Sequence, residues 1–216
     1  MPMTSWESLF PEIEKLGRIF TYNRLGVGKS SKASVIQTGE SVIDLLKEIL
    51  SELNVSPPYV LVAHSIGGLF ANLFARLRPE EVSSVVFVDA AHPDEKELQS
   101  EFKPPFILHK MNEGVKSIER IFDRYKYSED EQVTKTIQQI SEAGKFPPIP
   151  IAVVSGTKKM PLVPKESFRI HLQCQNRLLA LSPNSRHYIA ENSGHFPQIT
   201  EPSLVISAIK EVVSAK

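Results

Sequence analysis

Short apolar runs that alternate with segments of helical periodicity constrain this fold more than any other feature. Residues 59–63 (Tyr-Val-Leu-Val-Ala) and 85–88 (Val-Val-Phe-Val) are continuously apolar, which is typical of strands buried on both faces of a parallel sheet. Similar runs predict strands at 151–154 and 188–190, and a β-rich run at 19–22 predicts an earlier one. The chain is therefore expected to build a sheet from strands that are separated along the sequence.

Helices are predicted between these strands. Apolar residues recur at helical spacing over 35–53, where Ser34 and Gln37 form a possible capping box. A second helix is expected over 67–78, and a last one from Pro202 to about Val213. Strands that alternate with helices predict an α/β fold, with a mostly parallel sheet and helices on both faces.

One stretch, 92–148, interrupts this alternation. It contains no strand signal, many charges and several helical patterns, such as the one over 115–125. We expect a core domain made of 1–91 and 149–216, into which 92–148 is inserted as a helical lid. The alternative is that the inserted stretch forms ordinary surface helices.

Composition excludes several classes of function. Lys and Arg total 25, and Asp and Glu total 25, so no basic excess points to nucleic acid or to an anionic membrane. Cys174 is the only cysteine, which excludes an internal disulfide and a cysteine-rich zinc site. No signal peptide and no membrane span are predicted, and a cytoplasmic protein without metal or cofactor is expected. The oligomeric state is left open.

The strongest local signal is the segment 63–68, Ala-His-Ser-Ile-Gly-Gly, which follows a predicted strand and opens a predicted helix. Ser65 is expected on a sharp, strained turn that projects its hydroxyl above the sheet. Such a turn needs small residues two positions before and after the serine, and Ala63 and Gly67 meet that need. The helix N-terminus would point the N–H of Ile66 at a developing oxyanion. The alternative is an ordinary turn in which the serine caps a helix.

His195 lies in the segment 191–197, between the last predicted strand and the last predicted helix. The carboxyl ends of parallel strands share one edge of a sheet, so Ser65 and His195 are expected to meet there. A histidine within hydrogen-bonding reach can take the serine proton and later return it to the leaving group. The alternative is a histidine of a surface loop.

With these residues, the sequence resembles the α/β-hydrolase family over nearly its whole length. The resemblance rests on Ser5-Trp6, on 22–30 (Tyr-Asn-Arg-Leu-Gly-Val-Gly-Lys-Ser), on the Ser65 turn and on 193–196 (Ser-Gly-His-Phe). It implies an α/β-hydrolase fold and hydrolysis of an ester or related acyl compound through an acyl-serine intermediate. Ser65 would be the nucleophile and His195 the base, with a small-molecule acyl substrate and no cofactor.

The resemblance also implies an acid that orients the histidine. Many family members carry it after the next-to-last strand, at a place where this chain has Lys159. Other members, a lipase branch among them, carry it one strand earlier, and Asp89 stands at that place. We therefore expect Asp89 to be the acid. The alternatives are Asp94, Glu166 or no functional acid.

Family members normally have strands before the position of Ser5, and these end in a His-Gly loop that completes the oxyanion hole. This sequence begins after that loop, so we expect a core that is partial at its N-terminus. One oxyanion donor can contribute ~10²–10³ in rate. A catalytically impaired or inactive binding protein of the same fold therefore stays open as an alternative.

A third interpretation is a P-loop-like NTPase. The segment 26–30, Gly-Val-Gly-Lys-Ser, follows a predicted strand and precedes a predicted helix. The phosphate-binding motif, however, needs a glycine at the place of Asn23. This interpretation also leaves the Ser65 turn and the His195 loop without a role.

Overall fold

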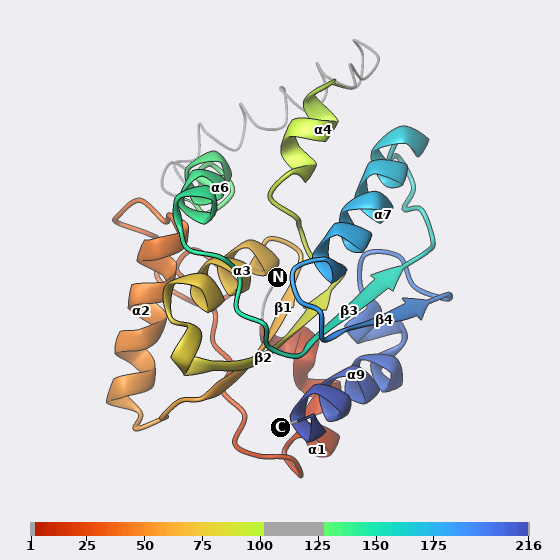
Figure 1. Cartoon of the computed structure of the whole chain (residues 1–216). Coiled ribbons are helices and arrows are strands. Elements are labelled where there is room, and N and C mark those ends of the chain that lie inside the picture. The colour runs from red at the N-terminus through yellow and green to blue at the C-terminus, as the bar shows by residue number, and fades with distance from the viewer. Residues whose placement is uncertain (1–2, 102–127, 216) are drawn as a thin grey trace.

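The computed structural model describes residues 3–101 and 128–215. The predicted helical pattern at 115–125 lies outside these residues. The described elements are shown in Figure 1 and follow one another as η1 (Met3–Leu9), α1 (Phe10–Ile13), α2 (Gly39–Glu52), β1 (Tyr59–His64), α3 (Gly67–Leu77), η2 (Pro79–Glu81), β2 (Val82–Val88), α4 (Glu95–Glu101), α6 (Val133–Glu142), β3 (Ile151–Gly156), α7 (Lys165–Leu179), β4 (Ser185–Ala190), α8 (Pro197–Thr200) and α9 (Pro202–Ser214).

The strands form one parallel sheet in the order β1-β2-β3-β4. Ala63 on β1 is in register with Phe87 on β2, and Phe87 is in register with Val153 on β3. Because all pairings are parallel, the carboxyl ends of β1, β2, β3 and β4 lie at one edge. The expected α/β fold with a parallel sheet flanked by helices is thereby confirmed.

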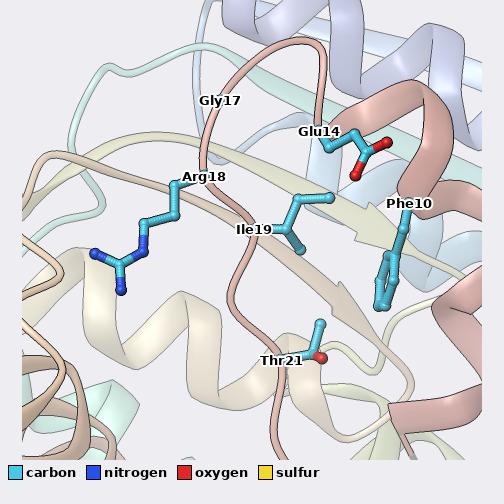
Figure 2. A pocket seen from close by; sticks show the side chains of 6 residues that line it. All are labelled: Phe10, Glu14, Gly17, Arg18, Ile19 and Thr21. Atoms are coloured by element: carbon cyan, nitrogen blue, oxygen red, sulfur yellow. The ribbon is translucent and has the colours of Figure 1, made fainter.

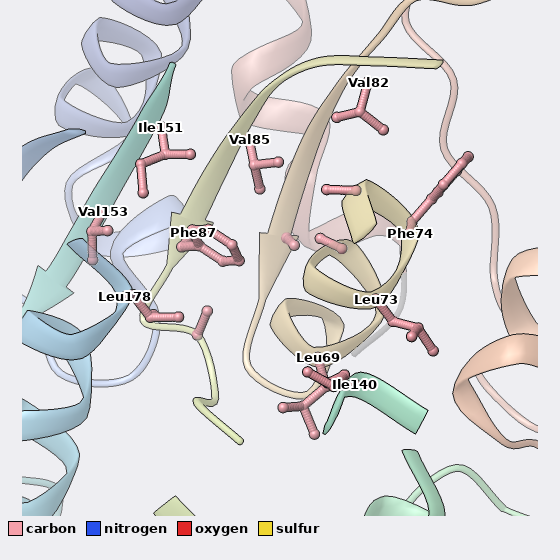
Figure 3. Packing of buried hydrophobic residues seen from close by; sticks show 14 of the residues in the cluster. Leu69, Leu73, Phe74, Val82, Val85, Phe87, Ile140, Ile151, Val153 and Leu178 are labelled. Carbon is pink, nitrogen blue, oxygen red and sulfur yellow. The ribbon is translucent and has the colours of Figure 1, made fainter. Parts of the chain in front are cut away.

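Both faces of the two inner strands, β2 and β3, are covered, which explains why these strands are buried and mostly apolar. Successive side chains of a strand point to opposite faces. Val85 and Phe87 of β2 therefore pack with α3 and α7 on one face, in the cluster shown in Figure 3. Val86 and Val88 pack with α9 and η1 on the other face. Phe87 is fully buried, which is worth about 1.5–3 kcal/mol relative to an exposed side chain.

The strand predicted at 19–22 is not present: these residues form no regular element. A strand exists only where a neighbour accepts and donates its backbone hydrogen bonds. The composition of 19–22 favours a strand but does not show whether a partner strand is available. In the described sheet, β1 pairs with β2 and not with 19–22.

The capping box predicted at Ser34 and Gln37 was also wrong. The helix starts later, at Gly39, with Thr38 as its N-cap, and the Thr38 side chain accepts a hydrogen bond from Ser41 N. Gln37 instead donates its side-chain amide to Val35 O at 3.0 Å. The predicted helix 35–53 therefore begins four residues later than its apolar spacing suggested.

The described parts of 92–148 include α4 and α6. Helix α6 packs against α2 and α3, and Ile140 is buried in the same cluster as Phe87. Thr136 Oγ1 accepts a hydrogen bond from Gly39 N at 2.9 Å, so α6 also satisfies the first turn of α2. Among the described helices, none combines the length and the apolar character that crossing a membrane requires.

Candidate active site

Ser65 lies on the tight turn between β1 and α3. Its φ is +54°, in the left-handed region that a residue with a side chain seldom adopts. The Ser65 carbonyl accepts hydrogen bonds from Gly68 N and Ala91 N, both at 2.9 Å. These contacts hold the strained turn, and Ile66 follows it as the N-cap residue of α3.

The two glycines that follow Ser65 have different surroundings. A Cβ at Gly67 would lie 3.8 Å from the Ala63 Cβ, an ordinary contact. A Cβ at Gly68 would lie 2.6 Å from the Ala90 Cβ and 3.1 Å from the Ala91 carbonyl oxygen. The close approach that needs glycine is therefore at Gly68, where α3 meets the end of β2.

His195 reaches Ser65 from the loop between β4 and α8. Its Nε2 lies 3.1 Å from Ser65 Oγ, within hydrogen-bonding range. His64 donates its Nε2–H to the His195 carbonyl at 2.5 Å, and the two rings lie 4.6 Å apart between centroids. Burial lowers the pKa of His64 to about 4. His64 is therefore neutral near pH 7 and steadies the His195 backbone.

Asp89 follows β2 and lies on the other side of the His195 ring. Its Oδ2 is 2.7 Å from His195 Nδ1. Its φ is +42°, and its side chain is almost fully buried. The structure thus brings Ser65, His195 and Asp89 together in a line of two hydrogen bonds from three strand ends.

Two further groups contact the other oxygen of this carboxylate. Asp89 Oδ1 accepts a hydrogen bond from Gly156 N at 2.9 Å, and His171 Nε2 lies 3.2 Å from it. Burial acts to raise the pKa of Asp89, but the hydrogen bonds from His171, His195 and Gly156 outweigh it. They hold the pKa well below its ordinary value, so Asp89 is ionised near neutral pH.

His171 and Gly156 were not among the site residues expected from the sequence. His171 belongs to α7, and nothing in its local pattern shows which strand end it faces. Gly156 ends β3, and a Cβ there would lie 1.9 Å from the Gly194 carbonyl oxygen. A glycine between a buried strand and a polar loop was the one local signal that could have identified this close approach.

The alternative acids have other partners. Asp94 pairs with Arg177, and Glu166 pairs with Arg169 on the exposed side of α7. Lys159 donates its ammonium to the carbonyls of Met160 and Val163 at 3.0 and 2.8 Å.

The P-loop-like segment 26–30 lacks the surroundings that phosphate binding requires. It follows no strand, and α2 begins only at Gly39, so the segment does not lead directly into a helix N-terminus as a phosphate-binding loop does. The Ser30 hydroxyl donates to the Asn23 carbonyl. Among the described residues, no group of three or more His, Cys, Asp or Glu side chains could hold a metal ion.

Two cavities lie apart from Ser65. One, of about 490 Å³, is bordered by α1 and by the segment that follows it, and Figure 2 shows its lining residues Phe10, Glu14, Gly17, Arg18, Ile19 and Thr21. The other, of about 640 Å³, lies among α3, α4 and α6, with Asn72, Arg76, His92 and Ile140 in its wall. Neither has Ser65, His195 or Asp89 in its described lining.

The sequence of this chain matches a known protein family. The profile of the family described as alpha/beta hydrolase fold matches residues 2–137. The uncharacterized protein YqjL of Bacillus subtilis is 27% identical over 212 residues, which cover 96% of this chain and 78% of that protein. A 2-hydroxy-6-oxo-6-(2'-aminophenyl)hexa-2,4-dienoic acid hydrolase of Metapseudomonas resinovorans is 25% identical over 237 residues, covering 98% of this chain and 79% of the relative.

A solved structure shares the fold as well. A thermophilic esterase from Thermogutta terrifontis superposes with a TM-score of 0.62 at 19% identity, over 100% of this chain and 86% of that one. The profile match extends over well more than half of the chain, and together with the hydrolase relatives it supports hydrolase activity. The chain belongs to the α/β-hydrolase fold family.

Proposed function

We propose that this protein is a serine hydrolase that cleaves an ester or a related acyl compound through an acyl-serine intermediate. The observation that carries the proposal is the pair of hydrogen bonds at His195, whose Nε2 is 3.1 Å from Ser65 Oγ and whose Nδ1 is 2.7 Å from Asp89 Oδ2. A nucleophile, a base and an orienting acid in that order are the elements of acyl transfer by a serine hydroxyl.

The first half of the reaction forms the acyl-enzyme. Ser65 Oγ attacks the carbonyl carbon while His195 Nε2 takes its proton, and Asp89 stabilises the imidazolium that results. The Ile66 N–H, at the N-terminal end of α3, is the proposed donor to the oxyanion. His195 then protonates the leaving group as the bond between the carbonyl carbon and the leaving oxygen breaks.

The second half reverses these roles with water. His195 takes a proton from a water molecule, whose oxygen attacks the acyl carbon. Collapse of the intermediate breaks the bond to Ser65 Oγ, which recovers a proton from His195. The products are a carboxylic acid and an alcohol. Each proton transfer passes through one ring nitrogen of His195, while the other stays with Asp89.

The relatives support hydrolysis at a coarser level than this proposal. One is named as an esterase and another as a hydrolase of a dienoic acid. An ester and a related acyl compound are both compatible with the proposed site.

We further propose that 92–148 forms a lid over a core of 1–91 and 149–216. In this proposal the lid selects the substrate.

The first prediction tests the nucleophile. Ser65→Ala removes the attacking oxygen, so it should abolish labelling by a fluorophosphonate and turnover of p-nitrophenyl acetate or butyrate. The circular dichroism spectrum should stay unchanged, because Ala fits the space of Ser. Ser207→Ala is the matched control, since Ser207 lies on α9 and donates to the Ser203 carbonyl; it should label normally.

Labelling that persists in the Ser65→Ala variant would sink the assignment. So would a wild-type chain that folds but neither labels nor turns over an ester. If that chain nevertheless bound a small ligand, it would be a binding protein built on the same fold.

A further inference from the structure

His171 joins the proposed site to a second carboxylate. It projects from α7, and its Nε2 lies 3.2 Å from Asp89 Oδ1 while its Nδ1 lies 2.9 Å from Glu95 Oε1 on α4. A neutral imidazole has one N–H donor and one acceptor nitrogen. Both nitrogens face carboxylate oxygens, and these two contacts are both satisfied only by the doubly protonated, charged ring. The Gln175 side-chain nitrogen also lies 3.3 Å from Nε2, but it donates a shorter hydrogen bond, of 2.8 Å, to the Ala90 carbonyl.

The surroundings of the ring agree with this charge. The His171 side chain is 15% exposed and the Asp89 side chain 5%, so solvent screens their interaction weakly. Burial acts to lower the pKa of His171, but its hydrogen bonds to Asp89 and Glu95 outweigh that effect and raise it to about 10. The ring thus remains cationic across the neutral range.

We propose that His171 is a positioning residue of the site, an imidazolium whose contact with Asp89 Oδ1 holds that carboxylate where its Oδ2 meets His195 Nδ1. The proposal rests on the roles given above to Ser65, His195 and Asp89. In this role, the positive charge on α7 acts through Asp89 and does not contact the substrate.

The sign of the effect follows from the groups around His171. Within the described chain these are Asp89 after β2, Glu95 on α4, the amide of Gln175 on α7 itself, and His195, whose ring stands edge-on at 6.4 Å between centroids. Without the ring, Asp89 Oδ1 keeps the hydrogen bond from Gly156 N but loses its charged contact, so the carboxylate is held less firmly against His195 Nδ1 and kcat should fall.

The kinetic test is His171→Gln, in which the amide can still donate to Asp89 but carries no charge. The kcat for an ester and the fluorophosphonate labelling rate should fall severalfold with KM little changed, and the loss of rate expected in the wild type as His171 gives up its proton near pH 10 should be absent. His187→Gln is the matched control, because His187 contacts the Ser155 hydroxyl at 2.9 Å and no carboxylate. Its profile should coincide with that of the wild type.

Imidazole NMR of the full chain gives a readout that needs no activity. In the wild type, both ring nitrogens of His171 should stay protonated at pH 8, and Glu95→Gln should lower the pH at which this ring titrates. A doubly protonated His171 ring in a chain that never labels would reject the hydrolase function and retain the contact between His171 and Asp89.

Two results would overturn the inference. One is a His171 ring that is neutral at pH 8 in the wild type, a measurement that does not depend on how any variant folds. The other is a folded His171→Gln variant with a lower rate that still shows the wild-type loss of rate near pH 10, which would reduce His171 to a packing role.

Discussion

The Asp89 carboxylate faces three donor groups, and the Asp89 backbone lies in the left-handed region. His195 Nδ1 faces one oxygen, while Gly156 N and His171 Nε2 face the other. Aspartate tolerates the left-handed region better than most residues, so the φ of +42° at Asp89 carries less strain than it would at most other residues. The backbone conformation turns the side chain toward the edge at which Ser65 lies.

The second prediction concerns this residue. Asp89→Asn keeps the size of the side chain but removes the charge that favours the imidazolium and the correct tautomer of His195. The kcat for an ester should fall by up to ~10⁴. Asp94→Asn is the matched control, since Asp94 pairs with Arg177, and it should retain most of the rate. An Asp89→Asn enzyme with a near-normal rate would contradict the proposed role.

At the scale of elements, the site depends on how closely the end of β3 approaches the loop that carries His195. Lys158 N donates to the Ser193 carbonyl at 2.9 Å. The Gly156 backbone lies so close to the Gly194 carbonyl that a Cβ on Gly156 would be 1.9 Å from its oxygen. No side chain fits between these two backbones. The distance from Asp89 to His195 is therefore set by backbone contacts as well as by the side chains themselves.

The third prediction uses this contact. Gly156→Ala places a Cβ 1.9 Å from a backbone oxygen, so one of the two segments must shift and stability should fall by about 2–4 kcal/mol. Gly67→Ala is the matched control, because its Cβ would meet only the Ala63 Cβ at 3.8 Å. Urea unfolding should show this difference, and equal midpoints for the two variants would refute it.

The sequence predicted those elements whose burial is encoded locally. The continuous apolar runs at 59–63 and 85–88 identified β1 and β2, and helices cover both faces of β2. The run at 19–22 has the same composition, yet pairing depends on a neighbour that composition does not reveal. The contact between His171 and Asp89 could not be predicted for a similar reason, because it forms only once α7 has packed on the sheet.

At the scale of the whole molecule, the charged contacts of the site make stability depend on pH. The pKa of His171 is raised to about 10, from an ordinary value near 6.5. Its contribution is complete below about pH 6.5 and is lost as the pH rises through 10. The pKa of Asp89 is lowered, so its contribution is present above its ordinary value of about 4 and is lost as the pH falls.

The fourth prediction follows from the His171 window. The wild-type Tm should fall by a few degrees between pH 6.5 and 10, and His171→Gln should show a smaller fall because it carries no titrating ring. His187→Gln should keep the wild-type slope. Thermal melts followed by circular dichroism at several pH values measure this, and parallel slopes in all three proteins would speak against it.

The three strand ends that meet at Ser65 also determine when the site can exist during folding. The Asp89–His195 and Ser65–His195 hydrogen bonds join residues 106 and 130 positions apart, so each closes a long loop. Loop closure over such separations slows the formation of native contacts relative to local helices. A chain with its helices formed is consequently still without the Ser65–His195 hydrogen bond, which forms only when β4 docks beside β3.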